Sequence, residues 1–386
     1  MTQVAADPVN EPPVLDPLMT KTGSRRASRG RIEAFDEETL RKVRSHDPSP
    51  AVEKAETKED AASETSSLGG EDDEEEATTA PVLPAPSKIR RNSQQSYADR
   101  MHTSLVLDWD DTLFPTTWVR EDCKLDYRFH LHDQPDLGPG ERRDTIESFL
   151  QKHLVKVQEF LVEAASLANV FIVTLAKRGW VDTTMNNFMP GLATFVKENA
   201  EKVIYAQEFA DEEEVTRHLT QAAHMDPEKV AEFWTRVKGD AISKELDEFH
   251  SKHDVSWKNV ISLGDSDFER YGTLAAGQEY MRRAMEGGAL SPESSKHTAQ
   301  GVSKDGHLKR LRVKTVKMLD KPTVLELTAE LNLLRRWLAH IVRRDSGFDL
   351  EIEGTDDDNV LNELHRQVTG EEEGGLSWHD LAGMND

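Results

Sequence analysis

A cluster of acidic residues follows a short apolar run at Ser104-Leu105-Val106-Leu107. The run leads directly into Asp108-Trp109-Asp110-Asp111-Thr112. Two carboxylates spaced by two residues, in the loop just after a strand, could hold a divalent cation and act on a phosphate. Asp108 would attack phosphorus. Asp110 would protonate the leaving oxygen and then take a proton from water.

This chemistry needs a cation, because a bare carboxylate is repelled by a phosphate dianion. A set of ligands that offers only oxygen favours magnesium over zinc or copper. We therefore expect Mg²⁺ and a phosphorylated substrate at the loop that carries Asp108 and Asp110.

Short apolar runs alternate with helical patterns from Thr103 onward, which predicts a doubly wound α/β fold. The sheet would be parallel, with about five strands and helices on both faces, and its ligands would bind at the carboxyl ends of the strands. We expect Gly287 to Gly306 to be a loop and the last strand to lie at an edge. The expected strands are Ser104–Leu107, Val170–Val173, Val203–Ala206, Val260–Leu263 and Val313–Met318.

The first acidic loop resembles a motif of the haloacid dehalogenase superfamily. Leu105 to Thr112 has the form of its first motif, an apolar strand followed by Asp-x-Asp-x-Thr. Val170-Phe171-Ile172-Val173-Thr174 resembles its second motif, a strand that ends in Ser or Thr. The resemblance implies that the Thr174 hydroxyl donates to a phosphate oxygen. Leu175-Ala176 follows where many relatives have Asn, so recognition of the leaving group departs from the family pattern.

Lys238-Gly239-Asp240-Ala241-Ile242 resembles the third motif, a lysine near a helix start that precedes the fourth strand. The resemblance implies that Lys238 offsets charge between the nucleophile and the phosphate. Lys244 is the alternative, because it is closer in sequence to the fourth motif. We favour Lys238, since a helix start faces the strand ends whereas a lysine in mid-helix usually faces solvent.

The run from Val260 to Glu269 resembles the fourth motif, Gly-Asp followed four residues later by an acid. The resemblance implies that Asp265 completes a metal site with Asp108 and Asp110. Glu269 would be a further ligand, or it would orient Lys238 or a metal-bound water. The runs Tyr205 to Glu208 and Trp257 to Val260 are also similar to protist proteins of this superfamily.

The motifs occur in the family's order over about residues 101–345 and imply a magnesium-dependent phosphatase. Its intermediate would be an aspartyl phosphate on Asp108, with Asp110 as general acid and base. The ATPase branch has Thr at the position of Asp110. A phosphomutase remains an alternative, as does a phosphoprotein-binding scaffold protein on an inactive core. The segments between the motifs leave room for only a minimal cap, which in this superfamily often accompanies phosphoproteins as substrates.

Composition divides the chain into three parts. Apolar residues make up 37% of the 386 residues, a low share for a fully globular chain. Residues 1–100 are rich in Pro, Ser and Glu and are expected to be disordered, residues 101–345 form the catalytic domain, and residues 346–386 form an acidic tail with a short helix near Val360–Gln367. The net charge of −24 argues against general binding of nucleic acid.

Further patterns concern location, modification and packing. The single cysteine excludes an internal disulfide, and no apolar run approaches a membrane span, so a cytoplasmic location is the default. Paired arginines precede Ser28 and Ser93, as in sites of basophilic protein kinases. Trp109 and Trp180 flank the first two motifs, and we expect packing roles for their indoles.

Overall fold

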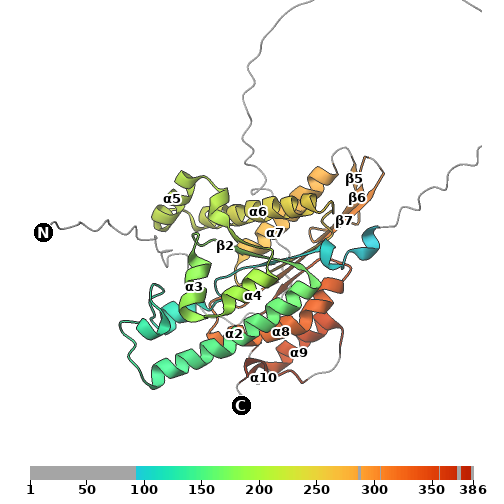
Figure 1. Ribbon diagram of the computed structural model, residues 1–386. Helices are drawn as coiled ribbons and strands as arrows, with labels where there is room; N and C mark the ends of the chain where they lie inside the picture. The colour runs from blue at the N-terminus through green and yellow to red at the C-terminus, as the bar shows by residue number, and fades with distance from the viewer. Residues whose placement is uncertain (1–92, 286–287, 305, 356, 372–374, 384–386) are drawn as a thin grey trace, which may run out of the picture. The chain divides into compact units, whose positions relative to one another are not determined.

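A mixed β-sheet between two layers of helices forms the centre of the computed structural model, which describes residues 93–285, 288–304, 306–355, 357–371 and 375–383 (Figure 1). The fold is α/β and Rossmann-like, with a mostly parallel sheet. In the described part of the chain the strands are β1 Thr103–Leu107, β2 Asn169–Thr174, β3 Lys202–Tyr205, β4 Asn259–Gly264, β5 Ala289–Leu290, β6 Thr298–Val302, β7 Leu308–Lys317 and β8 Phe348–Glu351.

The strand order reverses beside β1. The order across the sheet is β3-β2-β1-β4-β7-β6-β5, and β8 also pairs with β7. The five strands from β3 to β7 in this order are parallel, whereas β6 and β5 are antiparallel to their neighbours. The chain therefore moves outward from β1 to β3 on one side and returns to β4 on the other. Loops that follow β1 and β4 diverge at this switch point, where α/β sheets bind ligands.

Each predicted strand corresponds to a strand of the sheet, namely β1, β2, β3, β4 and β7. The predicted edge position of Val313–Met318 is wrong. β7 has β4 on one side, and on the other side it pairs with β6 through Leu308–Arg312 and with β8 through Lys314–Lys317. The prediction fails because β6 and β8, the partners of β7, lie in segments whose composition is typical of a loop and a tail.

The helices cover both faces of the sheet, as predicted. In Figure 1, α6 and α7 lie on one side of the sheet and α2 and α8 on the other. The described helices are α2 Glu141–Leu167, α3 Trp180–Phe188, α4 Leu192–Asn199, α5 Glu212–Gln221, α6 Pro227–Lys252, α7 Asp267–Ala284, α8 Val324–Arg343, α9 Asp358–Thr369 and α10 Trp378–Ala382.

Alternate residues of the central strands bury their side chains in two separate hydrophobic clusters. In β1, Leu105 and Leu107 belong to the cluster under α2 and α8, whereas Val106 belongs to the cluster under α6 and α7. Every residue of β1, β2 and β4 is buried, as expected for parallel strands that are covered on both faces. This double burial fixes the register of the strands and therefore the position of the loops after them.

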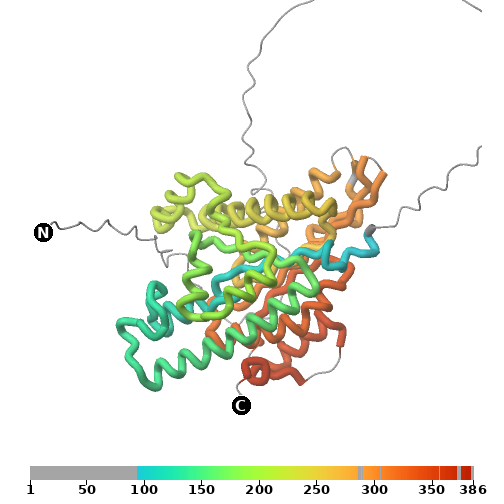
Figure 2. Tube along the Cα trace, in the orientation of Figure 1, coloured from blue at the N-terminus to red at the C-terminus, as the bar shows by residue number. Residues whose placement is uncertain are grey.

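Two segments contain more regular structure than predicted. β5 and β6 fall within Gly287–Gly306, where a loop was expected. Residues 346–383 include β8, α9 and α10 instead of an acidic tail, and the predicted short helix corresponds to α9. Ile352, Leu361 and Leu381 are buried in the cluster under α2 and α8, and Figure 2 shows this C-terminal segment beside α8. A few well-spaced apolar residues therefore anchor a segment whose composition is acidic.

The N-terminal predictions fall largely on residues that the structure does not describe. Ser28 lies outside the described residues, and so does the side chain of Ser93. From Gln94 onward the chain leads into β1, and the Tyr97 ring lies 3.9 Å from the Arg312 guanidinium carbon. Among the described helices, none is long and apolar enough to cross a membrane.

Candidate functional site

The carboxyl ends of β1, β2 and β4 bring three motif residues to one edge of the sheet. Leu107 pairs with Ile172 of β2 and with Leu263 of β4. Asp108 is the residue after β1, Thr174 ends β2, and Asp265 follows β4. The backbone N–H of Asp108 donates to the Leu263 carbonyl at 3.1 Å, which continues the ladder to the start of the loop. Because the strands are parallel and in register, the loops converge as predicted.

Asp108 is buried beside a cation. Its Oδ2 lies 2.7 Å from Lys238 Nζ, and its Oδ1 accepts the backbone N–H of Trp109 at 2.8 Å. Burial raises the pKa of Asp108 to about 7, and the nearby Glu269 and Asp110 add to this effect, while Lys238 opposes it. The carboxylate is therefore costly to ionise without further positive charge.

Lys238 joins Asp108 to Glu269. Its Nζ lies 3.0 Å from Glu269 Oε2, and both side chains are 1% exposed. Burial by itself would lower the pKa of Lys238, but the charges of Asp108 and Glu269 outweigh it and raise the pKa above its usual value. The ammonium group is therefore charged and held between two carboxylates.

Lys238 is the lysine at the site, but the prediction that it lies near a helix start is wrong. Lys238 lies in the middle of α6, which begins at Pro227, and not near a helix start. It reaches the strand ends because this face of α6 is buried against α7. Lys244 is exposed, and its Nζ lies 4.9 Å from the centroid of the Phe209 ring.

Glycines allow the close approach of these elements. A Cβ at Gly239, next to Lys238, would lie 3.0 Å from the carbonyl oxygen of Gly272 in α7. A Cβ at Gly264, at the end of β4, would lie 2.3 Å from Glu269 Oε1. Residues without a side chain at these positions therefore let α6, α7 and the β4 end meet at the site.

Glu269 has a fixed conformation because it also caps its own helix. Its Oε1 accepts the backbone N–H of Ser266 at 2.6 Å, and its Oε2 accepts the Ser266 hydroxyl at 2.7 Å. The Ser266 hydroxyl accepts the N–H of Phe268, which completes a capping box at the start of α7. A local helix-start signal thus positions the carboxylate that binds Lys238.

Three acidic residues could hold a metal ion at this edge. Oxygens of Asp108, Asp265 and Glu269 all lie within 4.8 Å of one another. Burial raises the pKa of Asp265 well above its usual value, and the charges of Glu269, Asp111 and Asp108 add to the rise. One lysine therefore faces several buried carboxylates, an arrangement that calls for further positive charge.

Asp110 hydrogen-bonds to a set of partners of its own. Its Oδ1 accepts the Thr116 hydroxyl at 2.5 Å and the indole N–H of Trp180 at 2.8 Å, and its Oδ2 accepts the Thr174 hydroxyl at 3.2 Å. Among the described residues, the acidic group that could hold a metal consists of Asp108, Asp265 and Glu269. The Asp110 carboxylate, which the sequence predicts to be a metal ligand, is not part of this group. Thr174, which was expected to donate to phosphate, donates to Asp110.

The third acid of the loop fixes the backbone. Asp111 has a positive φ of 50°, and its carboxylate accepts the backbone N–H and the hydroxyl of Thr117 at 2.8 and 2.5 Å. Burial raises the pKa of Asp111 to about 7, and the bonds from Thr117 oppose the rise. Asp111 therefore closes the turn from Asp111 to Thr117 that follows Asp110.

Sequence reasoning missed two of the donors to Asp110. For Trp180 packing was favoured over a position at the mouth of the site, and Thr116 was not singled out. The position of Trp180 just beyond the second motif was the available signal, since an indole carries a polar N–H as well as an apolar ring. Trp109 does pack as expected, and its indole also donates to the Thr184 hydroxyl at 3.0 Å.

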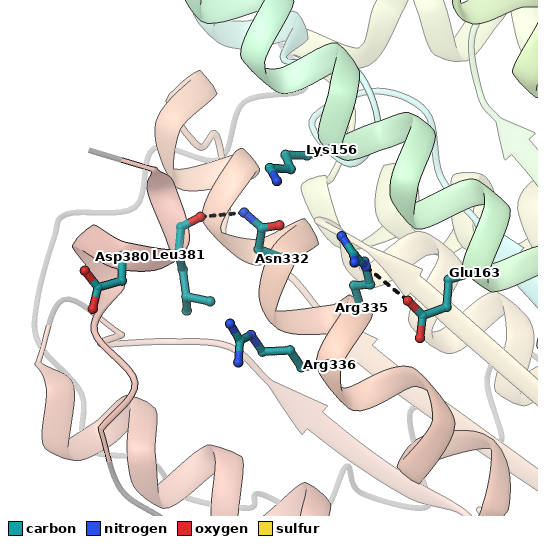
Figure 3. A pocket seen from close by; sticks show the side chains of 7 residues that line it. All are labelled: Lys156, Glu163, Asn332, Arg335, Arg336, Asp380 and Leu381. Atoms are coloured by element: carbon teal, nitrogen blue, oxygen red, sulfur yellow. Dashed lines mark hydrogen bonds and ion pairs between the residues drawn. The ribbon is translucent and has the colours of Figure 1, made fainter. Parts of the chain in front are cut away.

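A separate hollow of about 460 Å³ lies between α2, α8 and α10 (Figure 3). Arg335 Nε lies 3.1 Å from Glu163 Oε2, and the Asn332 amide donates to the Leu381 carbonyl at 2.6 Å. These bonds join α2, α8 and α10. We assign this hollow a structural role.

Comparison of the chain with protein-family models, with curated proteins and with solved structures finds no match.

Proposed function

We propose that this chain is a magnesium-dependent phosphatase of the haloacid dehalogenase superfamily that forms an aspartyl phosphate on Asp108. The observation that carries the proposal is the buried Asp108 carboxylate at the switch point of the sheet, 2.7 Å from Lys238 Nζ. Attack on a phosphate dianion needs such a group, a buried carboxylate with a lysine and two further acids beside it.

Charge balance supports a divalent cation. The carboxylates of Asp108, Asp265 and Glu269 are close together, and Lys238 is the cation bonded to two of them. These three acids offer only oxygen, the ligand type that magnesium prefers. Bound Mg²⁺ would neutralise negative charge on the approaching phosphate.

The other residues have roles that follow from their contacts. Asp108 attacks phosphorus, and Lys238 stabilises the negative charge between the nucleophile and the phosphoryl oxygens. Asp110, which is partly exposed, gives a proton to the leaving oxygen and later takes one from water. Thr174 orients Asp110 through the bond to its Oδ2.

The test is turnover of phenyl phosphate with Mg²⁺ by the wild-type chain and by Asp108→Asn. We expect turnover by the wild type and its loss in the variant, together with a phosphoenzyme that is sensitive to hydroxylamine, the reagent that cleaves acyl phosphates. Asp110→Asn is expected to slow turnover about 100-fold or more. Equal rates for wild type and Asp108→Asn would contradict the proposal and favour the scaffold alternative.

We propose a large phosphorylated substrate, such as a phosphoprotein. Between Thr174 and Lys238 the described chain forms α3, α4, β3, α5 and the first part of α6, and β3 joins the main sheet. This segment therefore adds no separate sheet over the site. Comparing turnover of phosphopeptides with turnover of small phosphorylated metabolites tests the class of substrate.

A further inference from the structure

The carboxylate of Asp110 has a different set of partners on each oxygen. Oδ1 accepts the Trp180 indole N–H at 2.8 Å and the Thr116 hydroxyl at 2.5 Å. Among the described residues, Oδ2 accepts one hydroxyl, that of Thr174, at 3.2 Å. Since each carboxylate oxygen has two lone pairs, both are used on Oδ1 and one stays open on Oδ2.

The direction of the hydrogen bond from the Thr174 hydroxyl to Asp110 is fixed by Ala176. The Thr174 hydroxyl oxygen accepts the backbone N–H of Ala176 at 2.9 Å. Its hydrogen is therefore free to point at Asp110 Oδ2. Thr174 is fully buried, so this arrangement is held by the end of β2.

The Trp180 indole is held in place on several sides. Trp180 is the first residue of α3, and Gly179 before it has a φ of 89°, a left-handed conformation that favours glycine. The indole packs edge-on against Tyr127, with ring centroids 5.0 Å apart. The Trp180 carbonyl accepts the Thr184 hydroxyl at 3.0 Å, and that hydroxyl in turn accepts the Trp109 indole N–H. The loop after β1 and the start of α3 are thus joined twice.

We propose that Trp180 is a positioning residue that, with Thr116, occupies Oδ1 of Asp110 and leaves Oδ2 as the atom that exchanges the proton during phosphoryl transfer. The inference rests on the proposed function, because it assigns how the general acid and base of that reaction is oriented. It also explains why a tryptophan lies beside the second motif, since its indole has an N–H donor as well as an apolar ring.

The proton moves as follows. When Asp108 attacks phosphorus, the bond from phosphorus to the leaving oxygen breaks, and the proton on Asp110 Oδ2 passes to that oxygen. In the second step a water oxygen attacks phosphorus and its proton passes to Oδ2. The bond from phosphorus to Asp108 breaks, and its electron pair returns to the carboxylate. Loss of the Trp180 donor lets the Asp110 carboxyl rotate, so both proton transfers are less well aligned.

The experiment compares Trp180→Phe with the wild type on phenyl phosphate and on 2,4-dinitrophenyl phosphate. Dinitrophenolate leaves without a proton, whereas phenolate needs one. We expect kcat/KM, which reports formation of the phosphoenzyme, to fall about tenfold on phenyl phosphate and less than about twofold on the dinitrophenyl ester. Thr116→Val removes the other donor to Oδ1 and is expected to give the same selective loss.

Trp337→Phe is the matched control, because it also removes a buried indole donor. The Trp337 N–H donates to His365 Nδ1 at 3.0 Å, and Trp337 lies in α8. This variant is expected to lose stability with no change in the ratio of rates on the two substrates. Circular dichroism of each variant checks its fold.

The outcomes separate the inference from the proposed function. Turnover by the wild type, with equal losses on both esters or no loss in Trp180→Phe and Thr116→Val, overturns the inference alone. If the wild type turns over neither ester, the proposed function fails and the inference fails with it. Should Trp180→Phe not fold, the ratio of rates in Thr116→Val decides.

Discussion

Lys238 Nζ lies 2.7 Å from Asp108 Oδ2 although the two residues belong to different layers of the fold, a helix and the loop after a strand. The same nitrogen lies 3.0 Å from Glu269 Oε2 in a second helix. A single ammonium group therefore joins α6, α7 and the β1 loop. Because all three side chains are buried, the charges act on one another with little screening by water.

Replacing Lys238 by Met is expected to lower kcat/KM for phenyl phosphate about 100-fold or more, because the nucleophile loses its buried cation. The melting temperature should also fall, since Asp108 and Glu269 are left without a counter-charge. Lys244→Met is the matched control, because Lys244 is an exposed residue of the same helix. Steady-state rates of the two variants check the prediction. Equal losses in both variants would contradict the assignment of the motif lysine.

Magnesium is expected to raise the melting temperature of the wild-type chain, because a ligand of the native state alone stabilises it. At a concentration about 100 times its dissociation constant, the ion would add about 2.7 kcal/mol. Asp265→Asn should lose most of this shift, whereas Asp267→Asn should keep it, since Asp267 forms an ion pair with Arg270 instead. Calorimetry with Mg²⁺ and with EDTA measures the shift in melting temperature of the wild type and of both variants. A wild-type melting temperature that does not change when Mg²⁺ is added would contradict the metal site.

The sequence was sufficient to predict the central strands and the convergence of their loops, for a physical reason. β1, β2 and β4 are buried on both faces, so each consists mostly of apolar residues and ends where the chain becomes polar. The acids after such runs must then lie at one edge of a parallel sheet. Asp108, Thr174 and Asp265 could be placed by this argument before any coordinates.

The sequence was not sufficient where tertiary contacts override composition. β6 contains Gly and Gln and was read as a loop, yet it pairs with five residues of β7. α10 was not predicted because it has few apolar residues, but its Leu381 and Ala382 are buried in the core. The direction of the Asp110 carboxylate was also out of reach, because it depends on where α3 places Trp180, and no local pattern encodes that contact.

Alanine at either of two glycines should disrupt the site in a different way. In Gly264→Ala the new Cβ would overlap Oε1, Cδ and Cγ of Glu269, so this buried side chain must move and its bonds to Lys238 and Ser266 are lost. In Gly239→Ala the new Cβ meets the backbone of Gly272, so α6 and α7 must move apart. We expect Gly264→Ala to lose turnover at least tenfold and to lower the melting temperature, because Glu269 no longer pairs with Lys238 or caps α7.

Gly239→Ala is expected to cost about 1–3 kcal/mol of stability, as overpacking does elsewhere. Gly138→Ala is the control for both variants, because a Cβ there meets nothing within 4 Å and the backbone needs no positive φ. Melting curves and rates with phenyl phosphate are measured side by side. Turnover at the wild-type rate by Gly264→Ala would contradict this assignment.

The buried acid Glu330 makes stability depend on pH. Burial raises the pKa of Glu330 to about 8, and the N–H of Leu319, which donates to its Oε1 at 2.8 Å, opposes the rise. Between pH 4.5 and about 8 the unfolded chain releases this proton and the native chain keeps it. The native state binds more protons there, so its stability falls as pH rises, by roughly 1.4 kcal/mol per pH unit for one group.

Glu330→Gln removes this proton uptake and keeps a side chain of similar shape. We expect the two proteins to have similar free energies of unfolding well below pH 4.5, where Glu330 is protonated in both states, and the variant to become progressively more stable than the wild type as pH approaches 8. Urea unfolding at several pH values gives the difference directly. A difference that stays constant across this range would mean that Glu330 is ionised in the native protein, with a positive partner near its Oε2, for which no hydrogen-bond partner is found among the described residues.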